Sequence, residues 1–137
     1  MIPNVRPSQL YPNAGLANAV FPQSVAAAGT AATPWVAVPI GSRWMRTLLL
    51  LGALGAGSEQ LDYEQATSVG GAGAKALKTN VRTSAVNSQQ FDDEVDLDSN
   101  LDINNGFNFV RAKVTNTGGT GALVAIGLGF GPNEFAG

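Results

Sequence analysis

Short apolar or alternating segments, each closed by a turn signal, recur along the chain from residue 35 onward. Two of them, residues 61–66 and 107–114, alternate apolar with polar side chains, which is the period of a half-buried strand. We expect strands at 35–40, 44–51, 61–66, 76–86, 94–98, 107–114 and 122–128, with turns at 41–42, 52–58, 70–73, 104–106 and 117–121. Short strands at this spacing, without a convincing amphipathic helix, predict an all-β fold: a jelly-roll-like sandwich of about eight antiparallel strands.

The first 34 residues differ from the rest because they hold five of the seven prolines. Each proline fixes its own φ angle and pushes the preceding residue toward an extended conformation. The segment also carries bulky apolar side chains, which disordered tails usually lack. We therefore divide the chain into an extended, proline-rich N-terminal arm at 1–34 and a β-sandwich domain at 35–137. A disordered tail is the alternative. An extended arm of this length reaches on the order of 100 Å, far enough to lie across neighbouring subunits.

The chain contains no cysteine and no histidine. Ser-His-Asp and Cys-His catalytic arrangements, disulfides and the commonest metal ligand are therefore excluded within it. Catalysis through paired carboxylates, a lysine of lowered pKa or a borrowed cofactor stays open, but the residue types favour a protein that is no enzyme and holds no cofactor. Charged residues make up only 13% of the chain, about half the usual share, which favours a component that hides surface against partners.

Charge and hydropathy also bound the kinds of partner. The formal net charge is −2 and no basic stripe is present, so we expect no nucleic-acid binding. The strongest apolar run, at 48–54, is far shorter than the roughly 20 residues of a membrane-spanning helix, so we expect no membrane. The N-terminus has no charged head followed by an apolar block, so we expect no secretion signal.

Residues 92–102 form an acidic block with six carboxylates and no basic residue. Such hard oxygen ligands suit Ca²⁺. The EF-hand pattern fails, however, because leucine and phenylalanine stand where that loop requires glycine and a bidentate glutamate. We therefore favour an alternating strand with Val95 and Leu97 buried and the acids in solvent, and we expect no metal site.

The candidate contacts with partners are aromatic, basic and apolar side chains on the arm and the first predicted strands. Tryptophan and arginine dominate interface hot spots, although packing in the core is the alternative role for Trp35 and Trp44. Residues 1–58 carry three arginines and no acid, which suits an acidic surface on a neighbour. The partner-binding candidates are Arg6, Leu10, Tyr11, Leu16, Phe21, Trp35 and Arg43.

Five motifs between residues 35 and 130 carry a family resemblance. They are the strand led by Trp35, the apolar strand and glycine-rich turn at 48–57, Leu-Asp-Tyr-Glu-Gln-Ala-Thr at 61–67, Gly-Ala-Gly-Ala-Lys at 71–75, and Asp-Ile-Asn-Asn-Gly-Phe-Asn-Phe-Val-Arg-Ala-Lys-Val at 102–114. In these segments the chain resembles small structural proteins encoded near the major capsid gene of tailed phages. The likeness does not extend to the first 34 residues.

The resemblance implies a capsid cement, or decoration, protein of the podophage kind with a jelly-roll-like fold. Such a protein binds the outer surface of an icosahedral head and bridges neighbouring major capsid subunits. The implied partners are the major capsid protein and the chain itself, as a homodimer or homotrimer. The implied location is the exterior of the virion, after synthesis in the bacterial cytoplasm. The alternatives are another virion component (a tail, connector or fibre-base subunit) and a carbohydrate-binding jelly-roll module.

Overall fold

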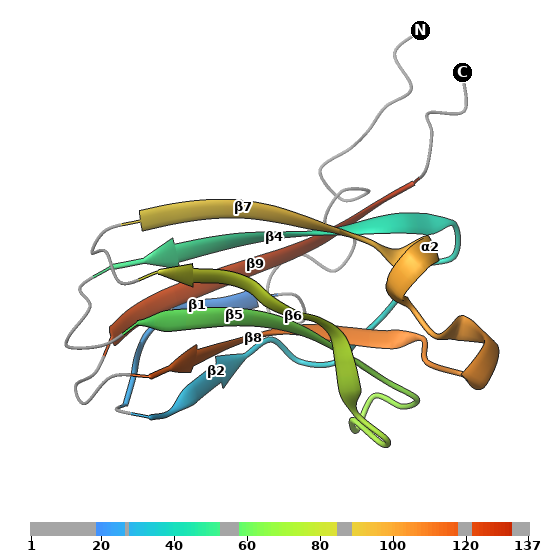
Figure 1. Ribbon diagram of the computed structural model, residues 1–137, viewed down its shortest axis with the longest axis horizontal. Coiled ribbons are helices and arrows are strands. Elements are labelled where there is room, and N and C mark those ends of the chain that lie inside the picture. Colours follow the sequence, from blue (N-terminus) through green and yellow to red (C-terminus); the bar gives the residue numbers. More distant parts are fainter. Residues whose placement is uncertain (1–18, 27, 53–57, 85–88, 118–121, 133–137) are drawn as a thin grey trace, which may run out of the picture.

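The computed structural model describes residues 19–26, 28–52, 58–84, 89–117 and 122–132. They form a sandwich of two antiparallel sheets that pack face to face (Figure 1). The first sheet has the strand order β1-β9-β4-β7, and the second has β2-β8-β5-β6 with the short strand β3 beside β8. The strands are β1 (Ala19–Val25), β2 (Thr30–Ala32), β3 (Val36–Ala37), β4 (Ser42–Leu51), β5 (Glu59–Ala66), β6 (Lys75–Ser84), β7 (Gln89–Asp96), β8 (Phe109–Asn116) and β9 (Ala122–Pro132). Two short helical turns, α2 (Leu97–Asn100) and η1 (Ile103–Asn105), connect β7 to β8.

The strand order is that of a jelly roll. The chain passes from one sheet to the other after β1, β3, β4, β6, β7 and β8, whereas β5 and β6 form a hairpin within the second sheet. As a result β9 lies between β1 and β4, and β8 lies between β2 and β5. This interleaving of strands from both ends of the sequence is what two Greek keys produce. The predicted all-β, jelly-roll-like sandwich is confirmed.

The core lies between the sheets and is built by alternation along each strand. On β8 every second side chain from Val110 is buried, and on β5 Leu61 and Tyr63 face the same way. The predicted alternation at 61–66 and 107–114 therefore gives the core-facing side of the second sheet. The main contributors from the first sheet are Met45, Leu49, Leu51, Val95, Val124, Ile126, Leu128 and Phe130.

Two strands lie inside the segment that the sequence assigns to the arm. β1 pairs with β9 and β2 with β8, and both contribute to the core through the buried side chains of Val25 and Ala31. The described part of residues 1–34 thus belongs to the sandwich, and the predicted boundary at 34 falls inside the fold. Pro22 is compatible with a strand because β1 is at the edge of its sheet, and the register shifts between Val20 and Gln23.

The strand predicted at 94–98 ends early and turns into a helix. β7 stops at Asp96, whose carboxylate accepts hydrogen bonds from the backbone nitrogen of Asp98 at 2.9 Å and the hydroxyl of Ser99 at 2.7 Å. This side chain caps the single turn of α2. Leu97 is still buried, as predicted, but from the helix. No helix among the described residues is long and apolar enough to cross a membrane.

Two other predicted elements also differ. The Asn-Gly sequence at 104–106 ends η1, with Gly106 at a φ of 83°, and the segment leads from the first sheet to the second instead of closing a hairpin. Of the strand predicted at 35–40, only Val36–Ala37 is assigned as strand, since Pro39 has no backbone donor for a longer ladder.

Candidate partner-binding surface at one end of the sandwich

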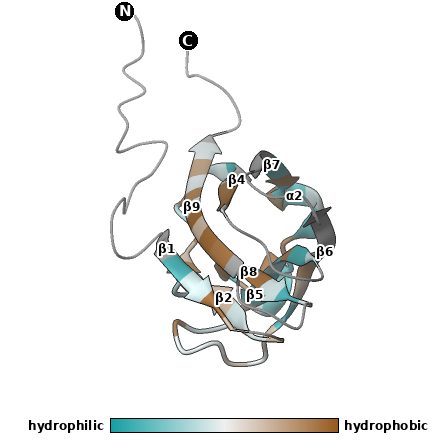
Figure 2. Ribbon diagram, turned by 90° about the vertical axis from the view of Figure 1, so that its left-hand side faces the viewer, coloured by the Kyte–Doolittle hydropathy of each residue, from teal (hydrophilic) through white to brown (hydrophobic). Residues whose placement is uncertain are grey.

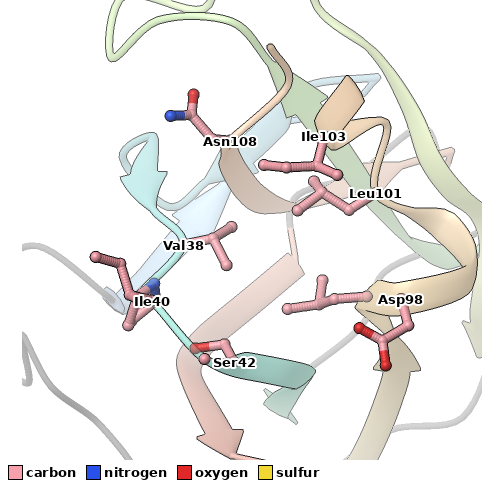
Figure 3. Close-up of a pocket in the computed structure, with 10 residues that line it drawn as sticks. Val38, Ile40, Ser42, Asp98, Leu101, Ile103 and Asn108 are labelled. Carbon is pink, nitrogen blue, oxygen red and sulfur yellow. The ribbon is translucent and has the colours of Figure 1, made fainter. Parts of the chain in front are cut away.

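A hollow of about 360 Å³ lies at the end of the sandwich where α2 and η1 connect the two sheets. Figure 1 shows α2 at this end, and Figure 3 shows the side chains that line the hollow. One wall is the segment 38–42 that leads into β4, and the other is the segment 97–103. Val38 and Ile40 come from the first wall, and Leu101 and Ile103 from the second (Figure 3). Most of the lining is therefore apolar, and Val38 and Leu101 also pack against the core.

The first wall is a tight turn that holds an isoleucine in solvent. The backbone nitrogen of Ser42 donates to the carbonyl of Pro39 at 3.0 Å, and Gly41 has a φ of 84°. This is the positive φ that a type II turn requires at its third position. Ile40, at the second position, is fully exposed, and Ile103 across the hollow is 58% exposed. A single exposed apolar residue is ordinary, but two around one hollow form an apolar rim.

The second wall is held by Gln65, a buried residue of β5. Its Nε2 donates to the carbonyls of Ala76 at 2.9 Å and Asn100 at 3.2 Å. Its Oε1 accepts from the backbone nitrogen of Asp102 at 2.8 Å. One amide group thus joins β5, β6 and the loop after α2, and fixes the loop that carries Leu101 and Ile103.

An ion pair fastens η1 to the start of β6. Asp102 accepts hydrogen bonds from Lys75 Nζ at 2.5 Å and from Asn105 Nδ2 at 2.9 Å. These bonds, that from Lys75 first, lower the pKa of the Asp102 carboxyl below its ordinary value. The Lys75 ammonium also lies 4.1 Å from the centroid of the Phe107 ring. The segment that carries Ile103 is therefore held in place by the ion pair and hydrogen bonds of Asp102.

Asp96, Asp98 and Asp102 of the 92–102 block each hold local structure together. The Ser99 hydroxyl, followed by the backbone donors of α2, lowers the pKa of Asp96. Asp98 pairs with Arg43 at the rim of the hollow, and both side chains are about half exposed, so the pair contributes little to stability. Within the described ranges, no three acidic side chains come close enough to hold a metal ion.

Replacing Gln65 with alanine is expected to lower the free energy of unfolding by about 2 kcal/mol, because buried backbone groups lose their partner. Urea unfolding followed by circular dichroism measures the loss. The matched control is Gln60→Ala on the same strand, where the amide donates to the carboxylate of Asp62, at 2.9 and 3.2 Å, and the expected change is within about 0.5 kcal/mol. Equal losses in the two variants would contradict the anchoring role of Gln65.

The structure describes the side chains of two of the seven residues predicted to bind a partner. Arg6, Leu10, Tyr11 and Leu16 lie outside the described residues, and Phe21 is placed only as part of the β1 backbone. Arg43 is exposed, and its ion pair with Asp98 places it beside the hollow. Trp35 is half-buried. Its indole lies so close to Gly71 that a Cβ at that position would touch it, and the Arg111 guanidinium lies 4.5 Å from its ring centroid. Neither Trp35 nor Trp44 lines the hollow.

The residues that build this surface were not predicted from the sequence. Ile40, Ile103 and Gln65 come from three separate segments, and their proximity depends on the jelly-roll connections. One local signal existed: an isoleucine between proline and glycine, at 39–41, stands between two residues that mark turns, and turns lie on the surface.

Comparison with known proteins identifies the fold and no family. The chain matches no protein-family model and no curated protein. The structure is similar to the crystal structure of PirA, with a TM-score of 0.53 and 16% sequence identity over 81% of this chain and 93% of that chain. At this identity the similarity supports the two-sheet architecture and carries no information on activity.

Proposed function

We propose that this chain is a structural virion protein of a tailed phage, a cement protein that binds the outer surface of the head and bridges neighbouring major capsid subunits. The observation that carries the binding role is the apolar rim of Ile40 and Ile103 around the hollow at one end of the sandwich. The motif resemblance at 35–130 supports the capsid as the partner.

The rim has the composition of a small interface centre. Burying each isoleucine against a partner stabilises a complex by about 1.5–3 kcal/mol, and the hollow between them accepts an apolar side chain of the capsid subunit. Ser42, Asp98 and Asn108 line the same hollow and supply polar groups around the apolar centre. An apolar centre with a polar border is the usual anatomy of a protein–protein interface.

Changing Ile40 or Ile103 to aspartate is expected to weaken binding to heads that lack the chain by at least about tenfold, which corresponds to about 1.4 kcal/mol. A charge at either position prevents burial of the rim, while the exposed side chain leaves the core unchanged. Co-sedimentation of the purified chain with purified heads measures the affinity.

The matched control is Val69→Asp, because Val69 is 68% exposed and does not line the hollow. It should bind heads like the wild type. Full affinity of the rim variants, or an equal loss in the control, would contradict the assignment of the hollow.

Copy number in the particle separates a cement protein, present at many equivalent positions, from a tail, connector or fibre-base subunit.

A further inference from the structure

The outer face of the first sheet carries a tryptophan that lies against a glycine. In β4 the side chains of Met45 and Thr47 fill the core, so Trp44 and Arg46 point outward. Trp44 stands opposite Gly131 of β9, and its indole ring covers this glycine so closely that a Cβ there would collide with it. Because Trp44 is half-buried and its inner side rests on Gly131, the rest of the ring faces solvent.

Charged side chains border this ring on the side of β7. Asp96 stands opposite Trp44 and Glu94 stands opposite Arg46, and all three charged side chains are exposed. Residues that face each other across two strands have Cβ atoms about 4.5–5.5 Å apart, and neighbours on one face of a strand are about 7 Å apart. One aromatic ring, two carboxylates and one guanidinium therefore lie within reach of a single small ligand.

The carboxylate of Asp96 is held in a fixed position beside the ring. Its bonds from the backbone nitrogen of Asp98 and the hydroxyl of Ser99, which cap α2, use one acceptor site on each oxygen. An ionised carboxylate has about four such sites, so Asp96 keeps the capacity to accept further hydrogen bonds. A side chain that is already fixed loses little conformational entropy when a ligand binds to it.

The other tryptophan, Trp35, is contacted by charged groups of the protein itself. The Arg111 guanidinium on β8 lies 4.5 Å from the centroid of its ring and donates to Glu64 of β5 at 2.7 Å. Lys113 donates to the second oxygen of Glu64 at 2.9 Å, and these three charged side chains are between 18% and 27% exposed. The charged groups of the second sheet thus satisfy one another against the ring, whereas those around Trp44 are exposed.

We propose that the outward side chains around Trp44 form a binding site for a neutral glycan. The site consists of Trp44, Arg46, Glu94 and Asp96. A pyranose ring has an apolar face of C–H groups, which packs on the open part of the indole, and a rim of hydroxyl groups. The hydroxyls accept hydrogen bonds from the guanidinium and donate to the carboxylates. Small-ligand sites commonly combine an aromatic surface with a few such polar groups, and jelly rolls include lectin domains.

The surroundings of the site select the kind of glycan. The site holds more negative than positive charge, so sugars that carry a carboxylate or a phosphate are repelled. Beyond Arg46, Leu48 stands opposite Gly127, where a Cβ would meet no atom within 4 Å, so an apolar and open surface can accept the next sugar of a chain. Figure 2 shows the apolar residues along β9. The site does not depend on the proposed function, because Trp44 does not line the hollow.

A printed array of neutral oligosaccharides (oligomers of glucose, mannose, galactose and N-acetylglucosamine) and of sialylated and uronic-acid oligosaccharides tests the proposal. The full chain should bind at least one neutral oligosaccharide and none of the acidic ones. Calorimetric titration with the neutral oligosaccharide that binds most strongly then gives the Kd. Trp44→Leu, Arg46→Ala and Glu94→Ala should each raise this Kd at least about tenfold. Arg46 and Glu94 are exposed, so their variants should keep the wild-type circular dichroism even if Trp44→Leu does not fold.

The control is Lys78→Ala, which removes an exposed charge from β6 in the second sheet and should leave the Kd unchanged. A wild type that binds no neutral oligosaccharide of the array would overturn the proposal, as would a preference for the acidic ones. Natively folded Arg46→Ala and Glu94→Ala variants that keep the wild-type Kd, or an equal loss in the control, would also overturn it.

Discussion

Replacing Gly131 with alanine should lower the free energy of unfolding by about 2 kcal/mol, although it adds a single methyl group. Gly131 lies on β9 opposite Trp44 of β4, and the indole covers the glycine. A Cβ at this position would lie 1.6 Å from Cζ2 and 1.9 Å from Cε2 of Trp44. No contact this short can persist, so the indole must leave its site or the two strands must separate.

Gly127→Ala is the matched control because it makes the same change on the same strand and face, where the new Cβ meets nothing within 4 Å. Its unfolding free energy should stay within about 0.5 kcal/mol of the wild type, since alanine suits a strand slightly better than glycine. Urea unfolding in dilute solution gives both values. Equal effects would show that the Trp44 contact is unimportant.

A double variant shows whether the loss at Gly131 arises from the indole. Trp44→Leu removes the ring that the new methyl group would strike. Alanine at 131 should then cost much less in the Trp44→Leu background than in the wild type, and the difference is the coupling energy of the pair. An unchanged cost would place the strain in the β9 backbone instead.

Glu59→Gln should stabilise the protein at neutral pH, by about 1 kcal/mol or more. Glu59 is 1% exposed, and neither carboxyl oxygen has a hydrogen-bond partner in the described part of the chain. Asn116 stands opposite it on β8, but the Asn116 amide donates to the carbonyls of Val25 and Ala26. Burial raises the pKa of the Glu59 carboxyl above its ordinary value of 4.5.

The sign of the pH dependence follows from this raised pKa. Between the ordinary and the raised value, the folded state keeps a proton that the unfolded state has released, so stability falls as pH rises through this window. A neutral glutamine does not titrate. Melting temperatures from pH 4 upward should therefore show the two proteins alike at acidic pH, with Glu59→Gln increasingly more stable toward neutral pH. A constant difference at every pH would contradict the ionisation argument.

Glu64→Gln provides a control of opposite sign on the same strand. The pKa of Glu64 is lowered by its bonds to Lys113 and Arg111, against the effect of burial, so its contribution is present at neutral pH and is lost as pH falls through the lowered value. Glutamine at 64 should therefore destabilise the protein at neutral pH, by about 1 kcal/mol, and the difference should shrink in acid.

The alternation of apolar and polar side chains was sufficient to predict the strands that have one buried face and one charged face. β5 and β8 follow the predicted pattern because one face is buried and the other carries Glu64, Arg111 and Lys113. β1 escaped prediction because it is stabilised by pairing with β9, about a hundred residues away, rather than by any local preference.

The candidate surfaces were less predictable than the fold. Ile40 and Ile103 share a hollow only because α2 and η1 cross from the first sheet to the second. The run of leucines at 48–51 is visible in the sequence, but the sequence does not show that β9 places alanine and glycine beside them. Such pairings depend on the strand order, which local patterns do not encode.

The central place of β9 sets when the protein can be completed during synthesis. Among the described strands, β1 has β9 as its neighbour and β4 has β9 and β7. Until β9 emerges from the ribosome, β1 is unpaired and one edge of β4, with its leucines, stays open. The first sheet therefore closes late, when β9 inserts between β1 and β4. This step is slow because it joins distant parts of the sequence. In a crowded cell, the yield of folded protein depends on whether that strand or another nascent chain reaches β4 first.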